Sequence, residues 1–164
     1  ILTDSPRIAM NQIPPSEWLE NVTFDEMVVG QSARLLRTLS TADIQAFAAV
    51  SGDTNPTHLN SDYANDTLFH GVIAHGMWGG ALISTLLGTE FPGPGTIYLS
   101  QTLKFKAPVR PGDTVTATVT VKEVNVAKNR VTLDTVCTVA GKAVIEGESL
   151  MMPPARAAAP GGTA

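Results

Sequence analysis

The hydrophobic positions divide the chain into a helical first part and a strand-rich second part. Four segments after residue 95 are rich in Val, Thr, Ile and Leu and are separated by short turns: 96–107, 114–124, 130–139 and 142–152. This pattern predicts antiparallel strands arranged as a meander. An imperfect alternation over 31–39 predicts one further strand ahead of them.

Two helices are expected between the first strand and the other four. Ser40 begins a helix N-cap pattern, and the apolar stripe that follows predicts a helix over 42–50. The segment 76–88 is apolar nearly all round, which predicts a buried helix. Gly88 is a natural end for that helix.

This order of elements predicts an α+β fold in which one antiparallel sheet wraps around a long central helix. We assign 30–152 to this domain, 1–29 to an N-terminal extension, and 153–164 to an Ala/Pro/Gly linker or tail. A curved sheet covers only one side of a helix that is apolar all round. A second copy of the chain could cover more of it.

Composition narrows the class of protein. A chain of 164 residues with 43% hydrophobic content fits one globular domain, and a net charge of −4 argues against nucleic-acid binding. The single Cys137 rules out an intramolecular disulfide and favours a reducing, cytoplasmic compartment. The stretch 67–89 has no charged residue, but its glycines and histidines favour a buried helix over a membrane span.

The candidate chemistry lies in the segment 51–58, where the first helix stops and a loop turns. Asp53 and His58 are five residues apart, and Pro56 pushes the preceding Asn55 out of the α region. Loops held by a rigid scaffold often carry acid–base groups. Polar pairs of this kind are also common in loops without any catalytic role, and these residues alone favour that simpler interpretation.

Three further stretches carry a family resemblance: FAAVSGDTNPTHLN at 47–60, GVIAHGMWGGALISTLLG at 71–88, and P-G-x-G-x-I-Y-L-x-Q-x-L-x-F-K-x-P-V-x-x-G-D at 92–113. In this order and spacing they resemble the MaoC-like (R)-specific enoyl-CoA hydratases. The resemblance implies a hotdog fold that dimerises sheet to sheet. It also implies a hydro-lyase that adds water reversibly to trans-2-enoyl-CoA and gives (R)-3-hydroxyacyl-CoA.

The resemblance implies a role for each matching residue. Asp53 and His58 would hold one water and exchange its protons, and which of them is the base stays open because coupled groups titrate together. The N–H of Gly76, at the start of the central helix, would stabilise the thioester oxyanion. Asn55 would support the loop, and Ser84 would orient the catalytic carboxylate.

Binding of an acyl-CoA needs an apolar pocket and cationic groups at its mouth. Candidates are Met77 and Trp78 for the pocket, and Lys104, Lys106 and Arg110 for the CoA phosphates. A solvated basic strand face is an equally open interpretation of the cations. We expect no cofactor beyond the CoA of the substrate and no metal, because the spacings of the three histidines fit no local zinc motif.

Two alternative functions remain. A hotdog thioesterase would usually place a carboxylate on the central helix, and 67–89 has none. A non-catalytic domain for acyl-CoA binding or assembly would not need the Asp53–His58 pair. The tail raises the further hypothesis of a fused C-terminal acyltransferase, such as a phosphate acetyltransferase.

Overall fold

The computed structural model describes residues 20–155, and most of the expected tail and most of the expected extension lie outside this range. The strands are β1 (Ser32–Thr38), β2 (Ile97–Phe105), β3 (Thr114–Asn125), β4 (Arg130–Val139) and β5 (Lys142–Met152). The helices are α1 (Thr41–Ser51), α2 (Pro56–Leu59), α3 (Ser61–Asn65) and α4 (Gly76–Thr89), with short 3₁₀ turns η2 (Phe24–Glu26) and η3 (Val126–Lys128).

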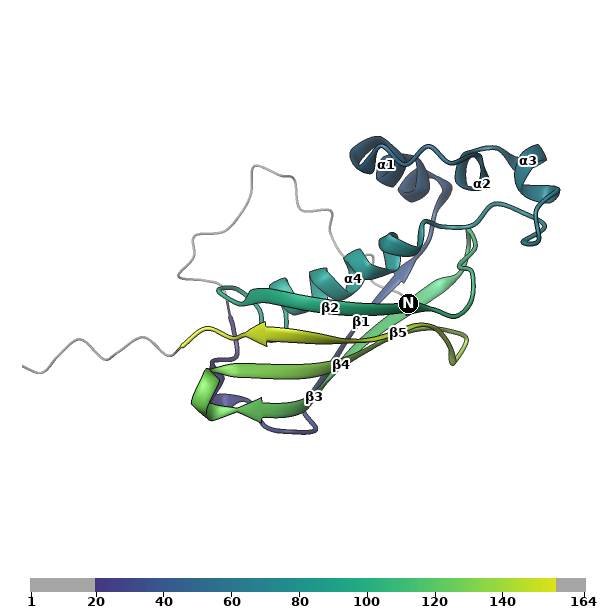
Figure 1. Cartoon of the computed structure of the whole chain (residues 1–164). Coiled ribbons are helices and arrows are strands. Elements are labelled where there is room, and N and C mark those ends of the chain that lie inside the picture. The colour runs from purple at the N-terminus through teal and green to yellow at the C-terminus, as the bar shows by residue number, and fades with distance from the viewer. Residues whose placement is uncertain (1–19, 156–164) are drawn as a thin grey trace, which may run out of the picture.

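The five strands form one antiparallel sheet in the order β1-β3-β4-β5-β2, which confirms the predicted α+β fold. The sheet curves around α4, and α1, α2 and α3 lie together beyond one end of it, near the start of α4 (Figure 1). This arrangement is the hotdog fold that the family resemblance implies.

The expected meander is wrong for one strand. β3, β4 and β5 are consecutive hairpins, but β2 pairs with β5 rather than with β3. Residues 106–113 therefore cross from β2, at one edge of the sheet, to β3, which is next to the opposite edge strand β1. Backbone bonds explain why Arg110-Pro111-Gly112-Asp113 is no hairpin turn: Gly112 donates to Leu39 and Leu39 donates to Asp113, which anchors the crossing beside β1.

The core lies between α4 and the concave face of the sheet. Ile83, Leu86 and Leu87 have no solvent exposure, and they face the alternating buried positions of β3 and β4. This alternation follows the pleat, because successive strand residues point to opposite faces. Cys137 belongs to this core, and burial raises the pKa of its thiol to about 11, so it is a packed hydrophobe rather than a nucleophile.

Helix α4 is not covered on all sides within one chain. Trp78, Leu82 and Ile83 face the sheet, whereas Met77 and Ser84 are on an exposed face. The sequence predicts a helix that is buried on all sides, whereas in a single copy of the chain only the face of α4 toward the sheet is buried.

The described part of the N-terminal extension packs onto the domain. Val22 donates a backbone hydrogen bond to Pro92, Phe24 donates to Pro154, and Met27 is buried in the core. Within residues 20–155, no helix is both long and apolar enough to span a membrane.

Candidate active site

The chain from Ser51 to Asn60 makes a turn that the local sequence explains. Gly52 ends α1 in the left-handed conformation with φ of 78°, which glycine adopts at low cost. Asn55 is the N-cap of α2, and its side-chain oxygen accepts from the Thr57 N–H at 3.0 Å. Pro56 is the first residue of α2, where its missing N–H costs nothing. Asn55 thus supports the loop that carries Asp53.

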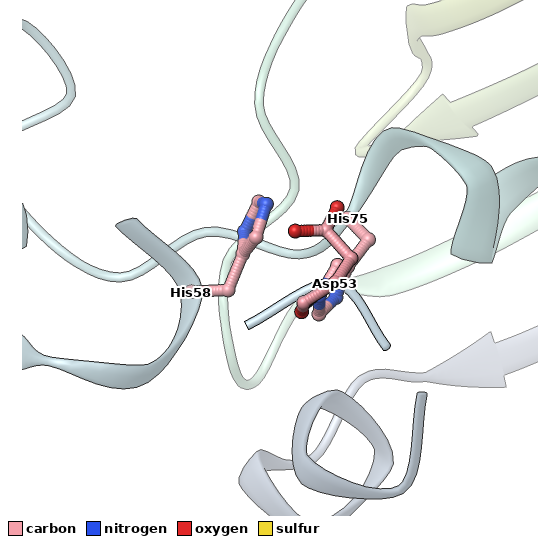
Figure 2. Close-up of side chains that lie close together, drawn as sticks. All are labelled: Asp53, His58 and His75. Atoms are coloured by element: carbon pink, nitrogen blue, oxygen red, sulfur yellow. The ribbon is translucent and has the colours of Figure 1, made fainter. Parts of the chain in front are cut away.

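This turn brings Asp53 and His58 together with a third residue, His75. The carboxylate of Asp53 and one ring nitrogen of each histidine lie within 4.8 Å of one another. Figure 2 shows the Asp53 carboxylate beside the His58 ring, with His75 close behind it. Asp53 is exposed in the single chain, His58 is half-buried, and His75 is buried with 3% exposure.

The hydrogen bonds of His58 settle which nitrogen is available for chemistry. Its Nδ1 lies 2.8 Å from the backbone oxygen of Ile73. A carbonyl oxygen only accepts, so Nδ1 carries the hydrogen and donates it. The neutral ring then keeps a free lone pair on Nε2, which can take a proton from water and return it.

Asp53 is held through its backbone and its carboxylate. The Asn55 N–H donates to the carboxylate at 3.2 Å, and the Asp53 N–H donates to the Ser51 hydroxyl at 3.2 Å. On the other side, His75 Nε2 lies 2.9 Å from the Asp53 backbone oxygen. Hydrogen bonds on both sides of Asp53 therefore hold the short loop segment that carries the carboxylate.

Gly76 begins α4, immediately after His75. The first N–H groups of a helix have no partner inside it and attract negative charge, so the Gly76 N–H is suited to a developing oxyanion. A methyl group here would force the Phe105 ring or the helix start to move, because a Cβ built on Gly76 falls 2.7 Å from that ring. Glycine at this position lets the ring and the start of the helix approach closely.

A small cavity lies behind the start of α4, against the sheet. Its volume is about 20 Å³, and its lining includes His75, Gly76, Trp78 and Phe105. That space suits a group the size of one water but not an acyl chain. Trp78 is buried on the sheet side of α4, whereas Met77 is 56% exposed on the opposite side.

The three cationic residues proposed to bind the CoA phosphates differ in exposure and in their partners. Lys104 and Lys106 are exposed near the end of β2, and Lys106 makes an ion pair with Glu146 at 3.1 Å. The Arg110 side chain is half-buried and donates to the Phe69 backbone oxygen, so it ties the loop after α3 to the crossing segment.

Ser84 does not touch Asp53 of its own chain. It lies two turns beyond Gly76, about 12 Å further along the helix axis at 1.5 Å per residue. No hydrogen bond joins the two side chains within residues 20–155 of one copy, and Ser84 is exposed.

His75 is the residue of this cluster that the sequence interpretation missed. Its position directly before the buried helix, within the stretch AHGM, was the available signal. We assigned that stretch only a helix start and an oxyanion donor, because nothing in the sequence indicates that the ring reaches back 22 residues. His70, the third histidine, is exposed with φ of 51° and lies away from this cluster.

Asp53, His58 and His75 are close enough to raise the question of a metal ion. His58 Nδ1 and His75 Nε2 are each already bonded to a carbonyl oxygen. The two rings are stacked at 3.9 Å with planes inclined by 30°. Each histidine thus has one ring nitrogen left without a carbonyl partner, and the expected absence of a metal at this site stays a prediction.

Comparison with known proteins identifies the family of this chain. The chain is 59% identical over 133 residues to an (R)-specific enoyl-CoA hydratase of Rhodospirillum rubrum, covering 81% of this chain and 92% of that protein. It is 45% identical to the (R)-specific enoyl-CoA hydratase of Aeromonas caviae, covering 81% of this chain and all of that one.

A solved structure of an R-hydratase from Pseudomonas aeruginosa superposes with a TM-score of 0.80 at 44% identity, covering 89% of this chain and 98% of that chain. Residues 20–146 match the family model described as the MaoC like domain. The chain belongs to the MaoC-like domain family, and its fold is that family's hotdog fold.

Proposed function

We propose that this chain catalyses the reversible, (R)-specific hydration of trans-2-enoyl-CoA to (R)-3-hydroxyacyl-CoA. The observation that carries the proposal is the convergence of the Asp53 carboxylate and the His58 ring, whose Nε2 keeps its lone pair, with His75 at the start of α4. The hydratase relatives, at 59% and 45% identity, support the substrate class and the stereochemistry.

In the proposed reaction, one water is held between Asp53 and His58. The water oxygen attacks C3 of the enoyl thioester, and the pair removes one proton from the water. The same pair delivers a proton to C2, so the sum is addition of H and OH across the double bond. Order between the two residues is not assigned, because they act on one water and titrate as a unit.

Negative charge that develops on the thioester oxygen during the attack needs a donor. The Gly76 N–H at the start of α4 is proposed for this role, since helix N-termini stabilise anions. The thioester itself activates the alkene. The proposed reaction therefore needs no metal, and it needs no cofactor other than the CoA that is part of the substrate.

We also propose that the working unit is a homodimer. Three observations in the single chain support this: the exposed face of α4, the edge strand β2, and the absence, within residues 20–155, of a hydrogen bond between Ser84 and its own Asp53. β2 exposes several large apolar side chains, namely Ile97 (50%), Leu99 (41%) and Phe105 (53%). A second copy would cover both surfaces, offer more space for the acyl chain, and bring its Ser84 toward the first copy's Asp53.

The cytoplasmic location expected from the single cysteine stays part of this proposal. A fused acyltransferase domain also stays a prediction, since most of the tail that suggested it lies outside the described residues.

A hotdog thioesterase is the second candidate, and α4 carries no carboxylate for it. Incubation of the full chain with crotonyl-CoA separates the two reactions. Hydration removes the ultraviolet absorbance of the conjugated enoyl thioester without releasing free thiol, and chiral analysis gives (R)-3-hydroxybutyryl-CoA. Release of free CoA at the same rate would contradict the proposal.

A further inference from the structure

His75 holds a position that neither the sequence motif nor the acid–base chemistry requires. It is the N-cap residue of α4, yet its side chain makes no capping bond to the helix. The ring instead reaches back to the loop of Asp53, 22 residues earlier in the chain. An N-cap side chain that bonds to a distant loop instead of to its own helix is a candidate for a residue that positions that loop.

The contact with Asp53 defines the tautomer of His75. Nε2 lies 2.9 Å from the Asp53 backbone oxygen, which only accepts, so Nε2 carries the hydrogen. Nδ1 is buried and has no hydrogen-bond partner among the described residues. A hydrogen on Nδ1 would be a buried donor without an acceptor, so the Nε2–H form is the one that this pocket accepts.

The faces of the same ring are used as well. His75 stacks on the His58 imidazole with centroids 3.9 Å apart, and Phe47 contacts it with centroids 5.0 Å apart. These contacts fix the orientation of the His75 ring. Its Nε2–H donates to the Asp53 backbone oxygen, and its face stacks on the His58 ring. Its own backbone leads directly into Gly76.

From these contacts we propose that His75 is the positioning residue of this site. Its Nε2–H holds the Asp53 loop in place, and its ring holds the His58 ring in place. Because Gly76 is the next residue, the His75 backbone also sets the position of the Gly76 N–H relative to Asp53 and His58. This inference rests on the proposed hydration, because it assigns His75 a role in that reaction. His75 takes no proton from the substrate or the water. It acts through the geometry of the groups that do.

The test uses two conservative variants of the full chain. His75→Phe keeps a ring that can stack on His58 but removes the N–H, and His75→Gln keeps an N–H at a similar reach but removes the ring. Misplacement of a catalytic group by about 1 Å costs roughly 100-fold in rate. We expect the kcat of crotonyl-CoA hydration to fall about 100-fold in His75→Phe, with KM changed less than threefold, and to be restored in part in His75→Gln, which keeps the N–H for Asp53 but loses the ring that stacks on His58.

His70→Asn is the matched control, because His70 is exposed, lies outside the cluster and has a left-handed φ that Asn tolerates. It should keep the wild-type kcat. An unchanged kcat in folded His75→Phe would overturn the inference. So would equal losses in both His75 variants that follow their melting temperatures, because that result indicates only a scaffold role.

A measurement on the wild-type protein keeps the proposal testable if the variants fail to fold. Nitrogen-15 NMR of the imidazoles should show His75 as the Nε2–H tautomer with a slowly exchanging ring proton, and an Nδ1–H tautomer would overturn the assignment. Failure of the proposed function looks different from both results, because wild-type protein would then not hydrate crotonyl-CoA at all.

Discussion

The imidazoles of His58 and His75 are stacked with centroids 3.9 Å apart, although 17 residues separate them in the chain. His58 belongs to the short helix α2, and His75 is the cap of the central helix α4. The stack therefore joins the loop that carries the acid–base pair to the helix that carries the oxyanion donor. One ring contact thus links the two parts of the proposed site.

The homodimer proposal predicts that Ser84 of one subunit serves Asp53 of the other. Asp53→Asn and Ser84→Ala proteins should each lose most of their activity alone. After unfolding and refolding together, mixed dimers contain one site with both mutations and one site with neither. Hydration of crotonyl-CoA should then recover toward a quarter of the wild-type rate per total protein at equal mixing, since about half of the dimers are mixed and have one intact site.

Two controls make this complementation decisive. Refolding each variant by itself should recover nothing, and size-exclusion chromatography should show dimers throughout. If the mixture stays as inactive as its components while dimers exchange, Ser84 either acts within its own chain or is not required.

The close approach of Gly76 and Phe105 predicts that Gly76→Ala lowers kcat only while the Phe105 ring is present. In Gly76→Ala the added methyl meets the Phe105 ring at 2.7 Å, so the start of α4 or the ring must move. We expect kcat to fall by about 10-fold to 100-fold, because the oxyanion donor moves with the helix start. The double variant Gly76→Ala/Phe105→Leu makes room and should recover much of that loss, as steady-state kinetics on crotonyl-CoA would show. A double variant as slow as Gly76→Ala would mean that the clash is not the cause.

Lys104 and Lys106 are predicted to differ in substrate binding. Lys106 is paired with Glu146, whereas Lys104 has no ion-pair partner within residues 20–155. Lys104→Ala should raise KM for crotonyl-CoA by about threefold to tenfold at low salt, and the effect should shrink in 0.5 M salt through screening. Lys106→Ala should have the smaller effect.

A crotonyl thioester that lacks the nucleotide provides the comparison for these variants. Its KM should be the same in Lys104→Ala and wild type, because there is no phosphate to contact. A KM change of equal size for both substrates would place Lys104 outside the CoA site.

Cys137 is predicted to be unreactive in the folded protein. Burial raises the pKa of its thiol to about 11, so at pH 8 nearly all of it is the protonated form, which is not the nucleophile. A thiol-specific dye should label the native protein very slowly and label it at once in denaturant. Rapid labelling under native conditions at pH 8 would show that this part of the sheet opens.

The elements of this fold were largely predictable from local pattern. β3 alternates buried and outward positions, as Val115, Ala117 and Val119 illustrate, and that period of two is visible in the sequence. Helix α4 was predictable from its apolar length and from Gly76, and its observed bounds extend only one residue beyond the expected range. These features depend on near neighbours in the chain.

The errors concern contacts between distant residues. The pairing of β2 with β5 depends on where residues 106–113 run across the sheet, and turn residues alone do not reveal a crossing. The role of His75 depends on a bond to Asp53, 22 residues away, and on a stack with His58. Neither contact leaves a spacing that a helix or strand period explains, so only the folded chain reveals them.

The central claim is that Asp53 and His58 act as one unit on one water. Asp53→Asn and His58→Gln should each lower kcat for crotonyl-CoA hydration by about 100-fold to 10,000-fold, because each removes a proton-transfer group while nearly keeping the shape. The double variant should lose little more than either single one, since half of a unit does not function alone. Melting temperatures and far-ultraviolet circular dichroism serve to establish that all three variants are folded.

The most direct measurement is therefore the kcat of folded Asp53→Asn, His58→Gln and double-variant proteins on crotonyl-CoA. The account predicts large, non-additive losses. Wild-type rates in either single variant would contradict it and would place the acid–base groups of the hydration elsewhere in the chain.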